Sequence, residues 1–136
     1  NKALRGFHET AVSDAVLAIE RHGATVVRDP ETDLLTINDE FTASVVVARS
    51  LRTGTGSLRW KIRLDAGLAP DLTVALRMDE ANEKAFDFYV LPRIDVGAAT
   101  QLRLCEENGV FLDAYRFDSL DDFFWLTRRV RIGRAA

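Results

Sequence analysis

The stretch from Asp33 to Arg49, DLLTINDEFTASVVVAR, constrains the fold of this chain more than any other. It holds a short apolar run ending at Ile37, an acidic turn at residues 38–40, and a longer run from Phe41 to Ala48. Two apolar runs joined by a tight polar turn predict a two-stranded ribbon. The second run is apolar at successive positions instead of alternating, so we expect it to be covered on both faces at the centre of a sheet.

An amphipathic helix is predicted ahead of the ribbon. Residues 9–22 place Val12, Ala15 and Ile19 at helical spacing, which gives the helix one apolar stripe. Gly23 follows as a C-terminal cap. A short strand over residues 24–28 and a turn over residues 29–32 then lead into the ribbon.

Three strands are predicted after the ribbon, beyond a flexible loop over residues 50–57 that contains two glycines. They cover residues 58–65, 71–78 and 85–92, where apolar and polar side chains alternate. We expect them to form a three-strand meander that completes a five-strand sheet with the ribbon.

In the C-terminal part, residues 98–108 allow two interpretations and residues 120–129 allow one. Residues 98–108 fit a helix that ends at Asn108-Gly109, or a strand at Leu102–Leu104 that turns at the same pair. A Ser-x-x-Asp capping box at Ser119 predicts a closing helix over residues 120–129. Its aromatic side chains cover too wide an arc to be solvated, so we expect them to pack on the sheet or on a partner.

Length and composition predict one soluble domain over residues 1–136. The chain is 47% hydrophobic and 29% charged, which is ordinary for a globular protein. A single cysteine, Cys105, excludes an internal disulfide and suits a reducing cytoplasm. The N-terminus has neither an initiator Met nor a signal-peptide pattern, so we expect a trimmed start or an excised part of a longer chain.

Charge is distributed unevenly along the chain. The formal net charge of -3 and the pI of about 5.4 disfavour a general electrostatic attraction to nucleic acid. Five cationic residues nevertheless fall within fifteen positions, namely Arg49, Arg52, Arg59, Lys61 and Arg63. The last three recur at every second residue of a strand, about 6.8 Å apart, a spacing suited to a phosphate backbone. We predict that these five bind nucleic acid; the alternative is a solvated strand face.

The order of these elements resembles the PD-(D/E)XK superfamily of nucleases, which includes restriction enzymes and small Holliday-junction resolvases. Many small members read approximately D-L-L-V-N-G-x-R-V-E-V-K-x-A-R, followed by a Trp-bearing strand and a strand that ends in Pro. The matching residues are Asp33-Leu34-Leu35, Asn38, Ala48-Arg49, Trp60 and Pro92. The resemblance covers most of residues 9–92. It implies a restriction-endonuclease-like α/β fold, in which a mixed, mainly antiparallel sheet of about five strands is flanked by an N-terminal and a C-terminal helix.

The resemblance fails at two of the three catalytic positions. In the superfamily, an Asp on one strand and a Glu-x-Lys on the next bind Mg²⁺ and activate water. Alignment on Ala48-Arg49 leaves Asp33 at the acidic position but puts Ser44 at the Glu and Val46 at the Lys. The second carboxylate that Mg²⁺ favours and the cation that stabilises the phosphate are therefore both missing. We predict a catalytically degenerate module without a cofactor, which binds DNA or a DNA-processing protein and does not enter a membrane.

Two alternatives stay open. In the first, the chain is a Mg²⁺-dependent nuclease in which Asp33 acts with Asp39 or Glu40, or with Glu9 or Glu20 of the first helix. In the second, it is a protein-interaction or homo-oligomerisation module with no role in nucleic-acid binding. The acidic pI favours the second, and the closing helix or a sheet edge would then form the contact.

Overall fold

A computed structural model describes residues 2–52, 54, 56–65, 67–97, 99–105 and 115–118, and for residues 2–5 and 86 it describes the backbone alone. The predicted closing helix over residues 120–129 lies outside the described residues. No helix in the described ranges combines the length and the apolar character needed to cross a membrane.

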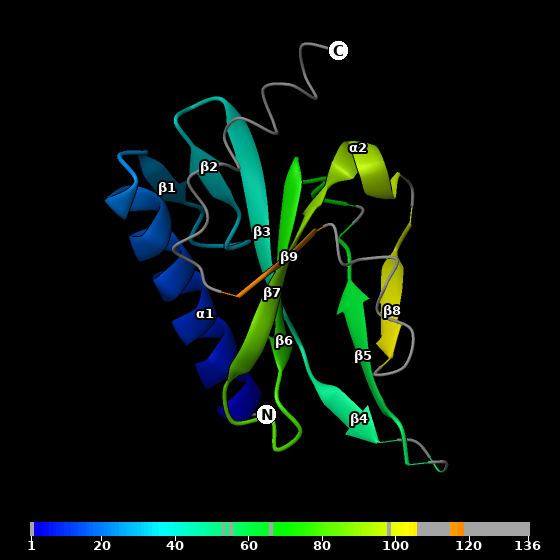
Figure 1. Cartoon of the computed structure of the whole chain (residues 1–136). Coiled ribbons are helices and arrows are strands. Elements are labelled where there is room, and N and C mark those ends of the chain that lie inside the picture. The colour runs from blue at the N-terminus through cyan, green and yellow to red at the C-terminus, as the bar shows by residue number, and fades with distance from the viewer. Residues whose placement is uncertain are drawn as a thin grey trace.

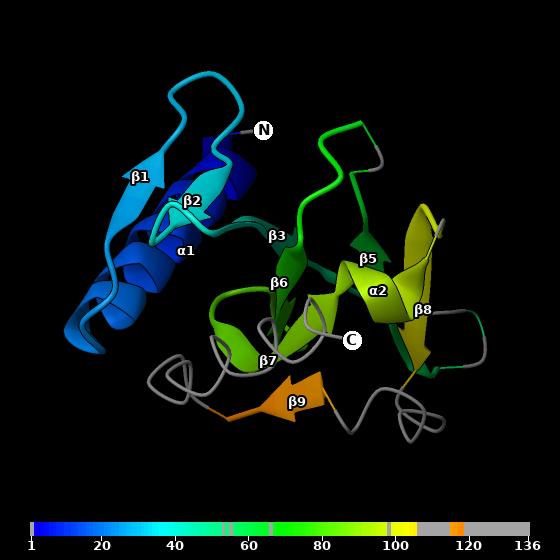
Figure 2. The same cartoon turned by 90° about the horizontal axis from the view of Figure 1, so that it is seen from above.

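The described elements form three layers, which Figures 1 and 2 show from two directions. The first layer is helix α1 (Lys2–Arg21). The middle layer is a six-stranded sheet in the order β1 (Val26–Arg28), β2 (Leu35–Ile37), β3 (Phe41–Ala48), β6 (Leu72–Met78), β7 (Ala85–Pro92) and β9 (Arg116–Phe117). The third layer is a three-stranded sheet of β4 (Ser50–Arg52), β5 (Leu58–Arg63) and β8 (Gln101–Cys105). The short helix α2 (Arg93–Val96) follows β7.

Helix α1 begins at Lys2 and not at residue 9, because residues 2–5 are Lys, Ala, Leu and Arg, which all have high helix propensity. Its predicted apolar stripe is buried against the six-stranded sheet. The predicted cap is confirmed at Gly23, which has a φ of 87° and donates its N–H to the Glu20 carbonyl over 3.0 Å.

Strand β3 has the central position predicted for it. It pairs with β2 in antiparallel and with β6 in parallel orientation. Val45 packs in the core under α1, while Ala48 packs in the second core under β5. The predicted fold class, a mixed and mainly antiparallel sheet with an N-terminal helix, is confirmed, with six strands in place of about five.

The predicted place of β5 is wrong. The β6–β7 hairpin forms as expected, with Val74 opposite Val90. Strand β5, however, pairs with β4 and β8 in the separate sheet. Its apolar residues Trp60 and Ile62 are buried against the face of the central sheet that α1 does not cover. Covering that face removes more apolar surface from water than adding one strand to an edge would.

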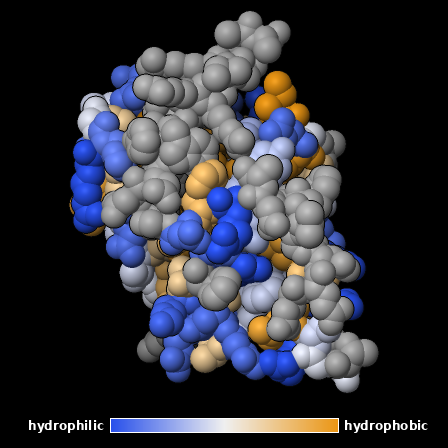
Figure 3. Space-filling model, in the orientation of Figure 1, coloured by the Kyte–Doolittle hydropathy of each residue, from blue (hydrophilic) through white to orange (hydrophobic). Residues whose placement is uncertain are grey.

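The predicted loop over residues 50–57 contains strand β4. Ser50 anchors it, because its hydroxyl donates to the Asp79 carbonyl over 2.9 Å and its N–H donates to Asn82 Oδ1 over 2.7 Å. Both partners belong to the turn between β6 and β7, and Figure 3 shows hydrophilic residues gathered at that end of the molecule. Of the two interpretations for residues 98–108, the strand is the one that forms, at Gln101–Cys105.

A buried ion-pair cluster joins the two sheets. Asp87 is 0% exposed and accepts hydrogen bonds from Arg77 Nε over 2.8 Å and from Arg116 Nε over 2.6 Å. The hydrogen bond from Arg116 to Asp87 raises the pKa of Arg116 above its ordinary value. The Arg77 guanidinium also lies over the ring of Trp60, 4.7 Å from its centroid. The cluster therefore links β6, β7 and β9 to β5 in the second sheet.

Candidate functional site

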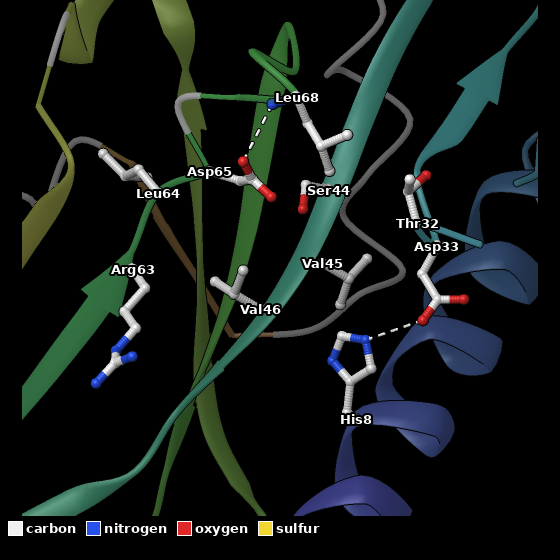
Figure 4. Close-up of a pocket in the computed structure, with 10 residues that line it drawn as sticks. All are labelled: His8, Thr32, Asp33, Ser44, Val45, Val46, Arg63, Leu64, Asp65 and Leu68. Carbon is white, nitrogen blue, oxygen red and sulfur yellow. Dashed lines mark hydrogen bonds and ion pairs between the residues drawn. The ribbon is translucent and has the colours of Figure 1, made fainter.

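A cavity of about 440 Å³ opens where α1, the turn before β2, β3 and the end of β5 meet. Figure 4 shows that Asp33, Ser44 and Val46 all line it. These are the three positions at which the resemblance to PD-(D/E)XK nucleases implies catalytic residues. All three positions border one cavity, but Asp33 is directed to His8 of α1, whereas Ser44 and Val46 lie on the face of β3 opposite to Val45 and α1 (Figure 4). Only one of the three side chains is a carboxylate.

Asp33 is held by its neighbours. Its backbone has a φ of 62°, a left-handed conformation that Asp tolerates better than most residues. One carboxylate oxygen, Oδ1, accepts a hydrogen bond from Arg28 Nε over 2.9 Å. The other, Oδ2, lies 3.4 Å from His8 Nε2. With its side chain 29% exposed, Asp33 faces the cavity with both oxygens engaged.

Arg28 links Asp33 to the first helix. Its terminal nitrogen donates to both oxygens of Glu9, over 2.9 and 3.0 Å. The hydrogen bond to Glu9, followed by the one to Asp33, raises the pKa of Arg28 above its ordinary value. A cation shared by Glu9 and Asp33 would have to displace this guanidinium. Within the described ranges, no group of three His, Cys, Asp or Glu residues is arranged to hold a metal ion.

The other carboxylates named from the sequence lie away from the cavity. Asp39 and Glu40 occupy the hairpin turn at the opposite end of β2 from Asp33, where the Glu40 N–H donates to the Ile37 carbonyl over 3.0 Å. Glu20 lies in the last turn of α1, about 18 Å along the helix from His8. None of the three lines the cavity.

The open face of the β4–β5–β8 sheet carries the predicted cations of β5. Arg59, Lys61 and Arg63 are exposed and alternate with buried Trp60 and Ile62. Arg49, where the chain passes from the central sheet to the second sheet, is also exposed.

Arg52 does not share the face of these cations. The register pairs it with Leu58, so it lies on the opposite face of the sheet from Arg59. Its guanidinium forms an ion pair with Glu80 and donates to the Gly56 carbonyl. Arg52 is therefore already neutralised by the β6–β7 turn.

Sequence reasoning missed Arg103. It lies on β8 directly opposite Lys61, and Gln101 lies opposite Arg63. The signal was the alternation of residues 101–104, which becomes informative only once the strand interpretation of that segment is chosen. Arg63 belongs both to this open face and to the lining of the cavity, so the cationic surface extends to the cavity rim.

No family model and no curated protein matches the sequence. Among solved structures, the chain is similar to a bacterial homing endonuclease, I-Ssp6803I, with a TM-score of 0.53 and 19% sequence identity. The match covers 94% of this chain and 94% of that chain. A similarity at this level of sequence identity supports the fold alone. It agrees with the nuclease-like fold predicted from the sequence.

The ion pairs around Arg28 give a first prediction. We expect Arg28→Ala to lower the free energy of unfolding by about 1 kcal/mol, because it leaves two partly exposed carboxylates without their shared cation. Arg28→Lys should lower the free energy of unfolding by about half as much, because an ammonium group keeps the charge but not the planar guanidinium with its several donors. Urea denaturation measures both, and equal stability of Arg28→Ala and wild type would show that the contacts contribute nothing.

Proposed function

We propose that this chain is a degenerate PD-(D/E)XK-type module that binds DNA through the open face of its second sheet and does not cleave it. One observation carries the proposal: the cavity that Asp33, Ser44 and Val46 line is bordered by Arg63 of the cationic face. A DNA-binding surface thus leads to a catalytic position that lacks its catalytic groups.

The chemistry of the cavity supports the absence of cleavage. Mg²⁺-assisted hydrolysis requires oxygen ligands that hold the ion and a charge that stabilises the phosphate in the transition state. Ser44 offers a weak neutral ligand and Val46 none, while Asp33 is already bound by Arg28 and His8. The Mg²⁺-dependent alternative needs a second carboxylate, which Asp39 and Glu40 do not bring to the cavity. Asp65 does line the cavity, but its Oδ1 already accepts the N–H groups of Gly67 and Leu68, both over 3.0 Å.

The charges of the open face support DNA binding despite the acidic pI. Arg59, Lys61, Arg63 and Arg103 project from one rigid sheet, and among the described residues no carboxylate lies within 4.0 Å of them. Cations without an internal partner release counterions from DNA when they contact phosphates, which is the main source of non-specific affinity.

A cleavage assay separates the degenerate and active interpretations. We expect supercoiled plasmid to stay intact with wild-type protein and Mg²⁺ or Mn²⁺, because the two carboxylates that line the cavity, Asp33 and Asp65, are already bound by other groups of the protein. Asp33→Asn, which keeps the shape of the side chain, should bind DNA within about twofold of wild type, since Asp33 contributes no favourable phosphate contact. Metal-dependent nicking by wild type that disappears in Asp33→Asn would instead establish the nuclease alternative.

A further inference from the structure

Two cations lie directly opposite each other on the open face. The antiparallel register pairs Lys61 of β5 with Arg103 of β8, and both are exposed. Directly opposed residues have Cβ atoms about 4.5–5.5 Å apart, and like charges at this separation destabilise a sheet. The described residues supply no carboxylate within 4.0 Å of either. The fold therefore holds a repulsive pair that an anionic ligand would relieve.

We propose that β5 and β8 enter the major groove of duplex DNA and that Arg103 and Gln101 read base edges there, an inference that rests on the proposed function. Next to the Lys61–Arg103 pair, Arg63 lies opposite Gln101. Arg and Lys donate to the O6 and N7 atoms of guanine, and Gln forms a paired hydrogen bond with adenine. This end of the sheet thus combines charge for phosphates with the side-chain types that distinguish bases.

The shape of this part of the sheet suits the major groove. Strand β4 pairs only with residues 58–60 of β5, so residues 61–63 and 101–103 form a two-stranded ribbon. A ribbon with strands about 4.8 Å apart fits a major groove about 12 Å wide, whereas a minor groove about 6 Å wide is too narrow. On the inner face, Ile62 and Leu104 are buried in the second core, which fixes the backbone that presents the outer side chains.

In the test, the 136-residue chain is used to select preferred sequences from a pool of randomised duplexes. The preferred duplex is then remade with 7-deazaguanine, which removes the N7 acceptor from the major groove without altering the charge or the minor groove. We expect affinity for the deaza duplex to fall on the order of tenfold. Arg103→Met should lose this tenfold penalty, because no donor then remains at this position to reach N7. Gln101→Ala should relax the preference at a different base pair.

Each remaining outcome overturns the inference. Salt-dependent duplex binding without an enriched sequence, or with the same deaza penalty in Arg103→Met, would exclude base reading but would still support the proposed function. Tighter binding to single strands than to duplexes would exclude binding in the major groove. Competition by polyglutamate as effective as by DNA of equal charge would assign the face to an acidic protein. Absence of any salt-sensitive DNA binding would remove the proposed function as well.

Discussion

Replacing Arg59, Lys61 and Arg63 together with Gln should weaken duplex DNA binding by about 10²–10³-fold at about 0.1 M salt. Each lost phosphate contact removes about 0.9 from the slope of log affinity against log salt, so the slope should flatten by about 3. The three side chains are exposed on one strand whose other face is buried, so we expect the fold to persist. Fluorescence anisotropy with a labelled duplex at several salt concentrations measures both quantities.

A charge-matched variant controls for net charge. Lys2, Arg5 and Arg21 all belong to α1, on the other side of the central sheet from β5 (Figures 1 and 2). Changing these three to Gln alters the net charge by the same amount but should leave the slope nearly unchanged. Equal losses in the two variants would mean that overall charge, and not the open face, governs binding.

Removal of the buried carboxylate should have the largest effect on stability. We expect Asp87→Ala to lower the free energy of unfolding by about 3–5 kcal/mol, because it leaves the guanidinium of Arg77 buried without its partner. The side chain of Arg77 is only 12% exposed, and it also stacks on Trp60. Urea denaturation followed by Trp fluorescence provides the measurement.

Asp118 provides the matched control for Asp87. It binds the same Arg116 over 2.8 Å, but its side chain is 80% exposed. Solvent screens such a pair, so Asp118→Ala should cost less than about 1 kcal/mol. If the two variants had the same stability, burial of Asp87 would not be what gives the cluster its strength.

The sequence predicted best the parts of the fold that depend on local pattern. The helix stripe, the cap at Gly23 and the doubly covered strand β3 follow from residue periodicity and backbone preference. Strand β5 was recognised as a strand but assigned to the wrong sheet. Alternation shows that one face of a strand is buried, but it does not show which surface covers that face.

The candidate site divides in the same way. That Asp33, Ser44 and Val46 border one cavity could be predicted, because the motif fixes their spacing along β3 and the turn before its neighbour β2. The ion pairs of Arg28 with Glu9 and Asp33 could not, because they join residues from three separate elements through side-chain geometry. The same holds for Arg103, whose position beside β5 depends on a pairing between strands distant in sequence.

The most direct test measures the affinity of the wild-type protein for a labelled duplex, in the presence of Mg²⁺, at a series of salt concentrations. The same samples are then run on a denaturing gel. Three exposed cations of the open face, Arg59, Lys61 and Arg63, predict a slope of about −2.7 in the log–log plot, with the DNA intact throughout. Affinity that does not respond to salt, or strands cut only when the metal is present, would contradict the claim that this chain is a nuclease-shaped DNA-binding module.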